Sequence, residues 1–316
     1  MSQRQKNITL LIVLAILMVC SVILGLVDTP TSTISNTSLF SVQDTSKVER
    51  ITIVSPSESI ELKKLDNVWK LNDKYKAEQN IVNVLLAILK DAEVTRQAPQ
   101  SQQKQLAKYI KDNGYLVKVY GQDKLIKSFY ASGNENKTTS YMMLEDEDQP
   151  FIMSIPGYGS YVAGIFEIPV DDWRDRLILS TTWRTLQQLE ITYAEYPKYD
   201  VNIQFKYNFL SVDNVDKLDT ARMMNFISEF NYLQADKYLT KGQDIKYDSL
   251  LNTPETVTLN VIDIDGKNSK KIRFFPLLPD DEMMLGHIEN DHQMVLFQTE
   301  RIQGIFAVQS DFEMKP

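Results

Sequence analysis

Cysteine is nearly absent from this 316-residue sequence, and Cys20 is the only one. A single cysteine excludes an intramolecular disulfide framework, and it excludes metal sites that need several thiolate ligands. The composition is otherwise typical of a globular protein, with 43% hydrophobic and 24% charged residues. The length allows one large domain or two of ordinary size.

Histidine is almost as rare. His287 and His292 lie in the segment GHIENDHQ, with Glu289, Asp291 and Asp281 nearby. Their spacing is not the i, i+4 pair of a helical zinc site, although a loop could gather them around a metal with a carboxylate. The alternative is a polar hairpin loop before the strand MVLFQ, and we favour it. We therefore predict no metal site and no cofactor.

A basic surface is also missing, because the chain carries a net charge of −8. Arg4 and Lys6 are the only charged residues before Asp28, so the rest of the chain is more acidic still. Nucleic-acid binders need a basic footprint, and anionic lipid headgroups would be repelled by an acidic surface. The charge therefore excludes a general nucleic-acid binder.

Familiar catalytic signatures are missing too. The sequence has no G-x-S-x-G elbow, no Walker A loop and no dinucleotide fingerprint. The segment Gly157–Ser160 comes closest to an elbow but lacks the second flanking glycine. Asp263–Gly266 resembles the start of a calcium loop but lacks its later ligands, and its Asp-Gly pair is typical of a hairpin turn. No catalytic residue is predicted.

One long hydrophobic run is present, from Ile8 to Val27, and it contains no charged residue. Twenty residues make about 30 Å of helix, enough to cross a bilayer. A cleaved secretory signal and a lipoprotein signal ending at Cys20 are the alternatives. We favour an uncleaved anchor with a cytoplasmic N-terminus, because the flanking positive charges precede the run. The Ser/Thr-rich residues 28–46 would then form a tether.

The rest of the chain predicts a repeated order of strands and helices. Alternating strands at 48–54, 58–64 and 68–71 precede an amphipathic helix at 77–94. That helix places Ile81, Val84, Leu85 and Leu89 on one face. A polar helix over 101–112 and four strands follow, at 115–121, 124–131, 139–144 and 150–154.

The same order returns from residue 184, with a strand at 186–193, a pair of strands within 201–210, a helix at 219–233 and a short segment at 247–253. VTLNVIDIDGKNSKKIRFF then parallels YLVKVYGQDKLIKSFY, and MVLFQTERIQGIFAV parallels YMMLEDEDQPFIMSI. The fold class is therefore α+β: an N-terminal transmembrane helix followed by two tandem related units of mainly antiparallel sheet, each with a covering amphipathic helix. The expected regions are a cytoplasmic stub and anchor (1–27), a tether (28–46), a first unit (47–154), a connector (155–183) and a second unit (184–316).

The connector has an unusual composition, rich in glycine, proline and aromatic residues. We favour a structural joint, in which Arg174 and Arg176 pair with Asp171, Asp172 or Asp175, or with carbonyls. A binding loop is the alternative, since glycine and aromatic loops also form ligand platforms. The residues expected to contact a partner or ligand are Tyr158, Tyr161, Phe166, Trp173, Arg174 and Arg176.

Three features together resemble a known family: the apolar N-terminal run, the strand VWKL before an amphipathic helix, and DDWRDR before the second set of strands. The chain is similar to the bacterial family of domain of unknown function 4340, in its Bacteroidetes-type form. This resemblance implies a single-span inner-membrane protein whose bulk is periplasmic. It also implies an accessory role near ABC-type transport components, and it brings no established catalytic residues.

Three functions follow as hypotheses. The first is a membrane-anchored, periplasm-facing scaffold or accessory protein of an envelope complex, with a protein partner in the envelope. The second is a periplasmic module that binds a glycan, lipid or peptide in a cleft between the two units. The third is an uncharacterised hydrolase. Exposure of Tyr158, Tyr161 and Trp173 in one cleft would favour the second, and burial of all three would favour the first.

Overall fold

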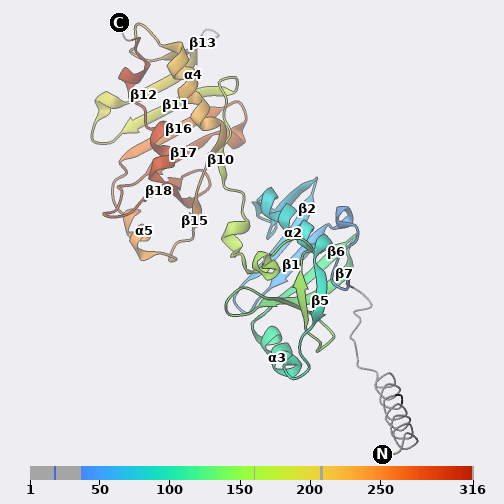
Figure 1. Ribbon diagram of the computed structural model, residues 1–316. Coiled ribbons are helices and arrows are strands. Elements are labelled where there is room, and N and C mark those ends of the chain that lie inside the picture. Colours follow the sequence, from blue (N-terminus) through green and yellow to red (C-terminus); the bar gives the residue numbers. More distant parts are fainter. Residues whose placement is uncertain (1–17, 19–36, 160, 207–208, 315–316) are drawn as a thin grey trace, which may run out of the picture. The chain divides into compact units, whose positions relative to one another are not determined.

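In the computed structural model, Met18 and residues 37–159, 161–206 and 209–314 are described. They form two compact units. Unit 1 contains the described residues up to Asp66 together with Ile81–Ile168, and unit 2 contains Asn67–Asn80 and the described residues from Pro169 onward. Helices accompany two large antiparallel sheets, which confirms the predicted α+β class (Figure 1).

The first sheet has nine strands. These are β1 (Arg50–Val54), β2 (Ser59–Leu65), β3 (Val68–Leu71), β4 (Tyr75–Lys76), β5 (Glu93–Gln97), β6 (Tyr115–Gly121), β7 (Lys124–Gly133), β8 (Ser140–Leu144) and β9 (Phe151–Ser154). Their order in the sheet is β4-β3-β2-β1-β6-β7-β8-β9-β5. Helix α2 (Gln79–Asp91) precedes β5, and helix α3 (Gln103–Asn113) follows it.

The second sheet has eight strands. These are β11 (Leu186–Tyr193), β12 (Val201–Lys206), β13 (Phe209–Val212), β15 (Lys237–Leu239), β16 (Val257–Asp263), β17 (Lys270–Phe274), β18 (Met283–Ile288) and β19 (Gln293–Gln298). Their order is β13-β12-β11-β16-β17-β18-β19-β15. A two-stranded sheet pairs β10 (Leu177–Leu179) with β14 (Leu233–Gln234), and the helices are α4 (Thr220–Ser228), α5 (Ile245–Leu250) and α6 (Thr299–Ile302).

The two large sheets share one strand order. Starting from β3, the first sheet runs β3-β2-β1-β6-β7-β8-β9-β5, and each of these strands has a counterpart in the second sheet at the same place in the order. The helices follow the same plan, because α2 and α4 come after the third strand of each set, and α3 and α5 precede the strand that pairs with the first. The predicted repeat of elements is therefore visible as a repeat of topology.

The second sheet is covered on both faces, whereas the sequence predicted a helix on one face only. In unit 2, Val295 and Phe297 share a core with the buried side chains of α4, which lies over the second sheet in Figure 1. Met294 and Leu296 pack instead with Tyr247 and Leu250 of α5. Because neighbouring residues of a strand point to opposite faces, α4 and α5 lie on opposite sides of the sheet.

Helix α2 buries a different stripe from the predicted one. Its buried residues are Val82, Leu85 and Leu89, whereas Val84 has an exposed fraction of 51%. Val82, Leu85 and Leu89 follow the i, i+3, i+7 spacing of a helix face. Val84 lies beside this stripe, and a valine there is left in contact with water.

The expected tether differs from the structure in its second half. Phe40 is 2% exposed and packs edge-to-face on Phe129 and Phe151, with ring centroids 5.8 and 5.7 Å apart. The backbone of Val42 donates to Leu89 O at 2.7 Å. Burial of an aromatic ring outweighs the polar composition of the segment, so residues 37–46 belong to unit 1.

Two of the longer strands, β5 and β18, were missing from the prediction, as were the short strands β4, β10, β14 and β15. Strand β5 is polar, with only Val94 buried, and it pairs with β9 at the edge of the first sheet. Strand β18 contains His287, which we expected in a loop, and it pairs with β19 as β8 pairs with β9. The segment that parallels the last strand of the first half, 304–308, forms no strand: it follows α6 and begins within the 3₁₀ helix Gln303–Ile305.

The predicted anchor, Ile8–Val27, lies outside the described residues except for Met18. Within the described part of the chain, no helix is both long enough and apolar enough to cross a membrane.

Candidate functional site

The segment expected to be a connector is divided between the two units. Residues 155–168 belong to unit 1, and residues from Pro169 onward belong to unit 2. The six residues that we predicted as contacts therefore occupy two different environments, which are described in turn.

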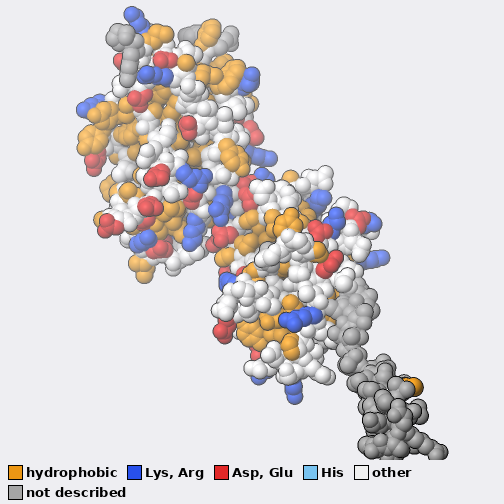
Figure 2. Space-filling model, viewed as in Figure 1, with side chains coloured by type: hydrophobic (Ala, Val, Ile, Leu, Met, Phe, Trp, Pro, Cys, Tyr) orange, Lys and Arg blue, Asp and Glu red, His pale blue; other side chains and the backbone are white. Residues whose placement is uncertain are grey.

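In unit 1, the turn-rich chain after β9 lies beside α2 and forms an apolar groove of about 490 Å³. We call this the apolar groove. It is lined by Val84, Ala87, Ile88, Asp91, Ile155, Tyr158, Tyr161, Val162, Gly164, Ile165 and Ile168. Hydrophobic side chains are visible on the face of unit 1 over α2 in Figure 2.

Two predicted residues line the apolar groove, and they differ in exposure and in hydrogen bonding. Tyr158 has an exposed fraction of 71%, and its backbone N–H donates to Ile155 O at 3.0 Å. Tyr161 is half-buried, and its hydroxyl donates to Glu167, which also pairs with Lys137 at 3.0 Å. Burial, followed by the hydrogen bond to Glu167, raises the pKa of the Tyr161 phenol. Tyr161 is thus a fixed wall, while Tyr158 is free to contact an incoming molecule.

Gly133 makes room for this wall. A Cβ atom added at Gly133 would lie 1.5 Å from the Tyr161 hydroxyl oxygen. Any side chain at this position of β7 would therefore push Tyr161 out of its place. The close approach explains why a glycine ends this strand.

Phe166 and Trp173 do not line the apolar groove, because both are fully buried. Phe166 packs edge-to-face on Phe129 in the core of unit 1, with ring centroids 6.0 Å apart. The backbone oxygen of Trp173, at the end of the 3₁₀ helix Val170–Trp173 in unit 2, accepts from Glu78 N at 2.8 Å. Both residues therefore belong to the packed interior of their own units.

The two arginines also differ. Arg176 pairs with Asp172 at 2.9 Å, as the sequence suggested. Arg174 instead places its guanidinium between the rings of Tyr75 and Tyr238, with its central carbon 3.8 and 3.4 Å from the ring centroids. No acidic residue in the described part of the chain lies within ion-pair distance of Arg174.

The histidine cluster does not converge on a point. His287 Nδ1 lies 3.2 Å from a guanidinium nitrogen of Arg273, and Glu289 binds Arg273 and Lys271. Burial, and then the nearby positive charge of Arg273, lower the pKa of His287. Among the described residues, no three His, Cys, Asp or Glu side chains are placed to hold a metal ion together. The histidine reads as a neutral residue of a polar sheet face.

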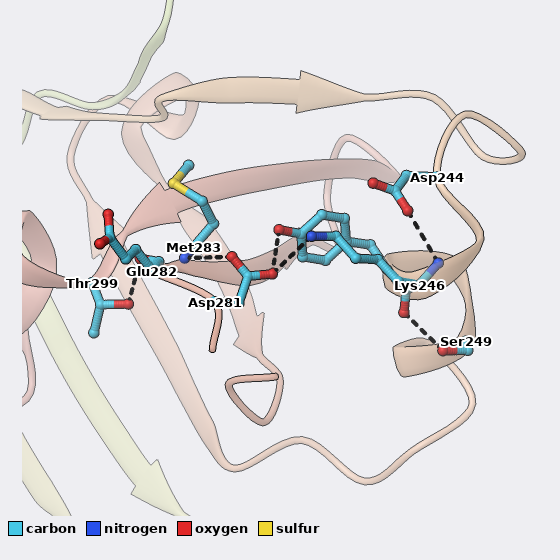
Figure 3. Close-up of polar contacts among 8 residues, drawn as sticks. Asp244, Lys246, Ser249, Asp281, Glu282, Met283 and Thr299 are labelled. Carbon is cyan, nitrogen blue, oxygen red and sulfur yellow. Dashed lines mark hydrogen bonds and ion pairs between the residues drawn. The ribbon is translucent and has the colours of Figure 1, made fainter. Parts of the chain in front are cut away.

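A further polar cluster in unit 2 joins α5 to the chain before β18 (Figure 3). The Asp281 carboxylate accepts from the Tyr247 hydroxyl at 2.7 Å, from Lys246 Nζ at 3.0 Å and from the Met283 backbone N–H at 3.0 Å. Burial alone would raise the pKa of Asp281, but these three donors outweigh it and hold the pKa below its usual value. With every carboxylate oxygen engaged, this cluster is a clasp for α5.

Several lining residues escaped the sequence prediction. The sequence pattern predicts that Val84 belongs to the buried face of α2. Its position one residue before Leu85 is the only local signal that separates it from that face. Tyr75 and Tyr238 come from β4 and β15, far from Arg174 in sequence. No local pattern connects them, so only the fold identifies the three residues as one cluster.

Comparison with known proteins identifies the family to which the chain belongs. A family model described as Domain of unknown function (DUF4340) matches residues 69–253, more than half of the chain and all of the apolar groove. No curated protein and no solved structure matches the chain. The resemblance seen in the sequence is confirmed, and the chain belongs to the family of domain of unknown function 4340.

Proposed function

We propose that this protein is a membrane-anchored, periplasm-facing accessory subunit of a bacterial envelope complex, and that it binds a protein partner through the apolar groove of unit 1. The observation that carries the proposal is the exposed apolar surface of the groove. Tyr158 and Val84 are exposed to water beside the half-buried Ile88. Exposed apolar area costs about 25 cal/mol per Å², and covering it favours association.

The length of the N-terminal segment supports a partner in the same membrane. If Ile8–Val27 spans the bilayer, only residues 28–36 separate it from Thr37, where the described part of unit 1 begins. Nine residues reach at most about 30 Å when fully extended. Unit 1 would therefore stay close to the membrane surface, within reach of the external parts of other membrane proteins.

The chemistry of the groove favours an apolar helix that carries a lysine or arginine as its occupant. Asp91 is the only acidic residue in the lining, and it is exposed at the groove's edge. A helix that lays its apolar face in a groove leaves its polar residues at the edge, where a cation can meet Asp91. Components of ABC-type transport systems are the first proteins to examine as the source of this helix.

The repeated strand order supports a related proposal about origin. Two sheets with eight corresponding strands are explained most simply if the two units are related and stand in tandem after the anchor. The apolar groove uses the glycine-rich segment after β9, and the chain after β19 forms α6 instead. We infer that the two units share a scaffold and that unit 1 has acquired the groove.

A pull-down of the tagged full-length chain in mild detergent tests the function. We compare the wild type with Val84→Asp in the groove and with Ile245→Asp, a matched control at an isoleucine of unit 2 that is 84% exposed. Because both sites are exposed, neither change should unfold the chain. A chain lacking residues 1–36 shows whether the membrane segment is needed.

The expected result is one membrane protein recovered in stoichiometric amount with the wild type and with Ile245→Asp, and reduced about tenfold or more with Val84→Asp. Equal recovery with Val84→Asp would contradict the groove as the docking site. Recovery of lipid or of a second copy of the chain in place of a partner would contradict the accessory role.

One observation favours the second hypothesis, a ligand-binding module. The groove volume of about 490 Å³ lies in the range of small-molecule pockets, and two of the three aromatic residues expected in a ligand cleft line it. Trp173, the third, is buried elsewhere. A glycan, lipid or peptide that protects Tyr158 from chemical labelling, with no protein partner recovered, would favour this alternative.

A further inference from the structure

Unit 2 contains a second pocket, of about 450 Å³, which is separate from the apolar groove. We call it the arginine pocket. It is lined by Lys74, Tyr75, Lys76, Arg174, Asp175, Leu177, Ile178, Tyr238, Asp265, Lys267, Asn268, Lys270, Ile288, Asp291 and Gln293. Its polar character contrasts with the apolar groove, and its residues come from the β3–β4 hairpin and from the body of unit 2.

Arg174 is held rigidly in this pocket. Tyr75 and Tyr238 cover the two faces of its guanidinium, and Gln293 accepts a hydrogen bond from one terminal nitrogen. The Tyr238 hydroxyl is itself fixed by Asp175 O at 3.0 Å. Stacking on aromatic faces leaves the edge of a guanidinium as the direction in which it binds carboxylates and phosphates.

The charge of Arg174 lacks a local counterion. Burial lowers its pKa, and the acids that favour its charge, Asp171 and Asp291, lie beyond ion-pair distance. An arginine stays charged in proteins, so removing it from water without an acid is costly. The two tyrosine faces offset part of this cost, and an anion at the free edge would offset more.

The other charged residues of the arginine pocket also leave an excess of positive charge. Lys76 is paired with Asp175 at 2.5 Å, and Lys270 with Asp291 at 2.6 Å. The Asp265 carboxylate accepts from the backbone N–H of Lys267. Five cations thus meet three acids in the lining, within a chain whose net charge is −8. Such a local reversal of sign is typical of a site that attracts anions.

We propose that the arginine pocket binds a small anionic ligand, with a carboxylate or phosphate group at the edge of Arg174 and with Lys74 and Lys267 at the rim. The pocket volume matches that of small-molecule sites. The ligand's oxyanion is the feature that is recognised. It can belong to a free metabolite or to a lipid headgroup that reaches the site from a nearby membrane.

Isothermal titration of the full-length chain in a neutral detergent tests this site. The probes are inorganic phosphate, glycerol phosphate and citrate in one arm, and a short-chain phosphatidic acid in the other. The variants are Arg174→Gln and the double variant Lys74→Ala/Lys267→Ala, which changes only exposed side chains. Lys241→Ala is the matched control, because Lys241 is exposed in unit 2 and does not line the pocket.

The expected result is saturable binding of at least one probe, unchanged in Lys241→Ala, weakened roughly threefold or more in the double lysine variant and roughly tenfold or more in Arg174→Gln. Stronger binding in the soluble arm would identify a free metabolite, and stronger binding of phosphatidic acid a headgroup. Binding that is equal in all variants, or no binding of any probe, would overturn the proposal. If Arg174→Gln fails to fold, the double lysine variant alone tests whether the probe binds in the arginine pocket.

Discussion

Asp281 provides the sharpest test of how unit 2 holds its shorter helix. The carboxylate side chain is 12% exposed and is the one acceptor shared by the Tyr247 hydroxyl and Lys246 Nζ. Replacing Asp281 with alanine leaves the Tyr247 hydroxyl without this acceptor, and Tyr247 is only 3% exposed. Helix α5 has six residues, so it depends on such contacts rather than on its own propensity.

The size of the stability loss in Asp281→Ala can be worked out from the hydrogen bond between Asp281 and Tyr247. A hydrogen bond to a charged group contributes about 1.5–3 kcal/mol when one partner is buried. Lys246 is largely exposed, so its ion pair adds little. We therefore expect Asp281→Ala to lower the free energy of local opening of α5 by about 2 kcal/mol, which makes amide exchange about 30-fold faster.

Hydrogen exchange of peptides that cover Ile245–Leu250, read by mass spectrometry, measures this local opening of α5. Glu282→Ala is the matched control, because it removes a neighbouring acid whose side chain is exposed. Tyr247→Phe should accelerate exchange by a similar factor, and the double variant should be less than additive. If Asp281→Ala changes exchange no more than Glu282→Ala does, the clasp does not hold α5.

The contribution of Asp281 to stability also depends on pH, and the direction of this dependence follows from its pKa. The pKa of Asp281 is lowered in the folded protein, since its hydrogen bonds outweigh the effect of burial. Its contribution to stability is therefore present above the usual carboxyl pKa of about 4, and it is lost as the pH falls through the folded value. The difference in exchange between the wild type and Asp281→Ala should shrink in that acidic range.

Three further predictions concern other sites. Gly133→Ala should destabilise unit 1 by about 1–3 kcal/mol, because the new methyl group displaces Tyr161. Thermal unfolding measures this loss, and Ser132→Ala at the preceding position is the control. Burial raises the pKa of Tyr193 to about 12, so wild-type stability should fall from pH 10 to 12, and Tyr193→Phe should reduce that fall. Burial and Arg273 lower the pKa of His287, so stability should fall as the pH drops below about 6.5, and His287→Gln should remove that loss.

Much of the fold could be predicted from the sequence because most strands have one buried face. Strand β1 alternates buried and partly buried residues, and its neighbours β2 and β6 do the same. Strand β18 was missed because it is packed between α5 on one face and the main core on the other, so its residues do not alternate in polarity. Strand β5 was missed because a polar edge strand has almost no apolar signal.

The candidate sites were less predictable, and the reasons are physical. The composition of the connector drew attention to Tyr158 and Tyr161, which line the apolar groove, but burial of Phe166 and Trp173 depends on tertiary packing that no local pattern encodes. The environment of Arg174 was predicted as an ion pair, since acids flank it in sequence, or as a contact with carbonyls. Stacking between two tyrosines from distant strands took the place of that pair.

Site-specific photo-crosslinking in intact membranes tests the proposed docking groove most directly. A benzophenone amino acid replaces Tyr158, and a second chain carries it at Tyr232, a control residue of unit 2 that is 64% exposed. We predict that position 158, and not position 232, is joined to an apolar segment of a membrane protein that contains a lysine or arginine. Crosslinks from position 158 only to lipid, to the chain's own residues 8–27 or to the proteins that position 232 also captures would contradict the groove as a partner-binding site.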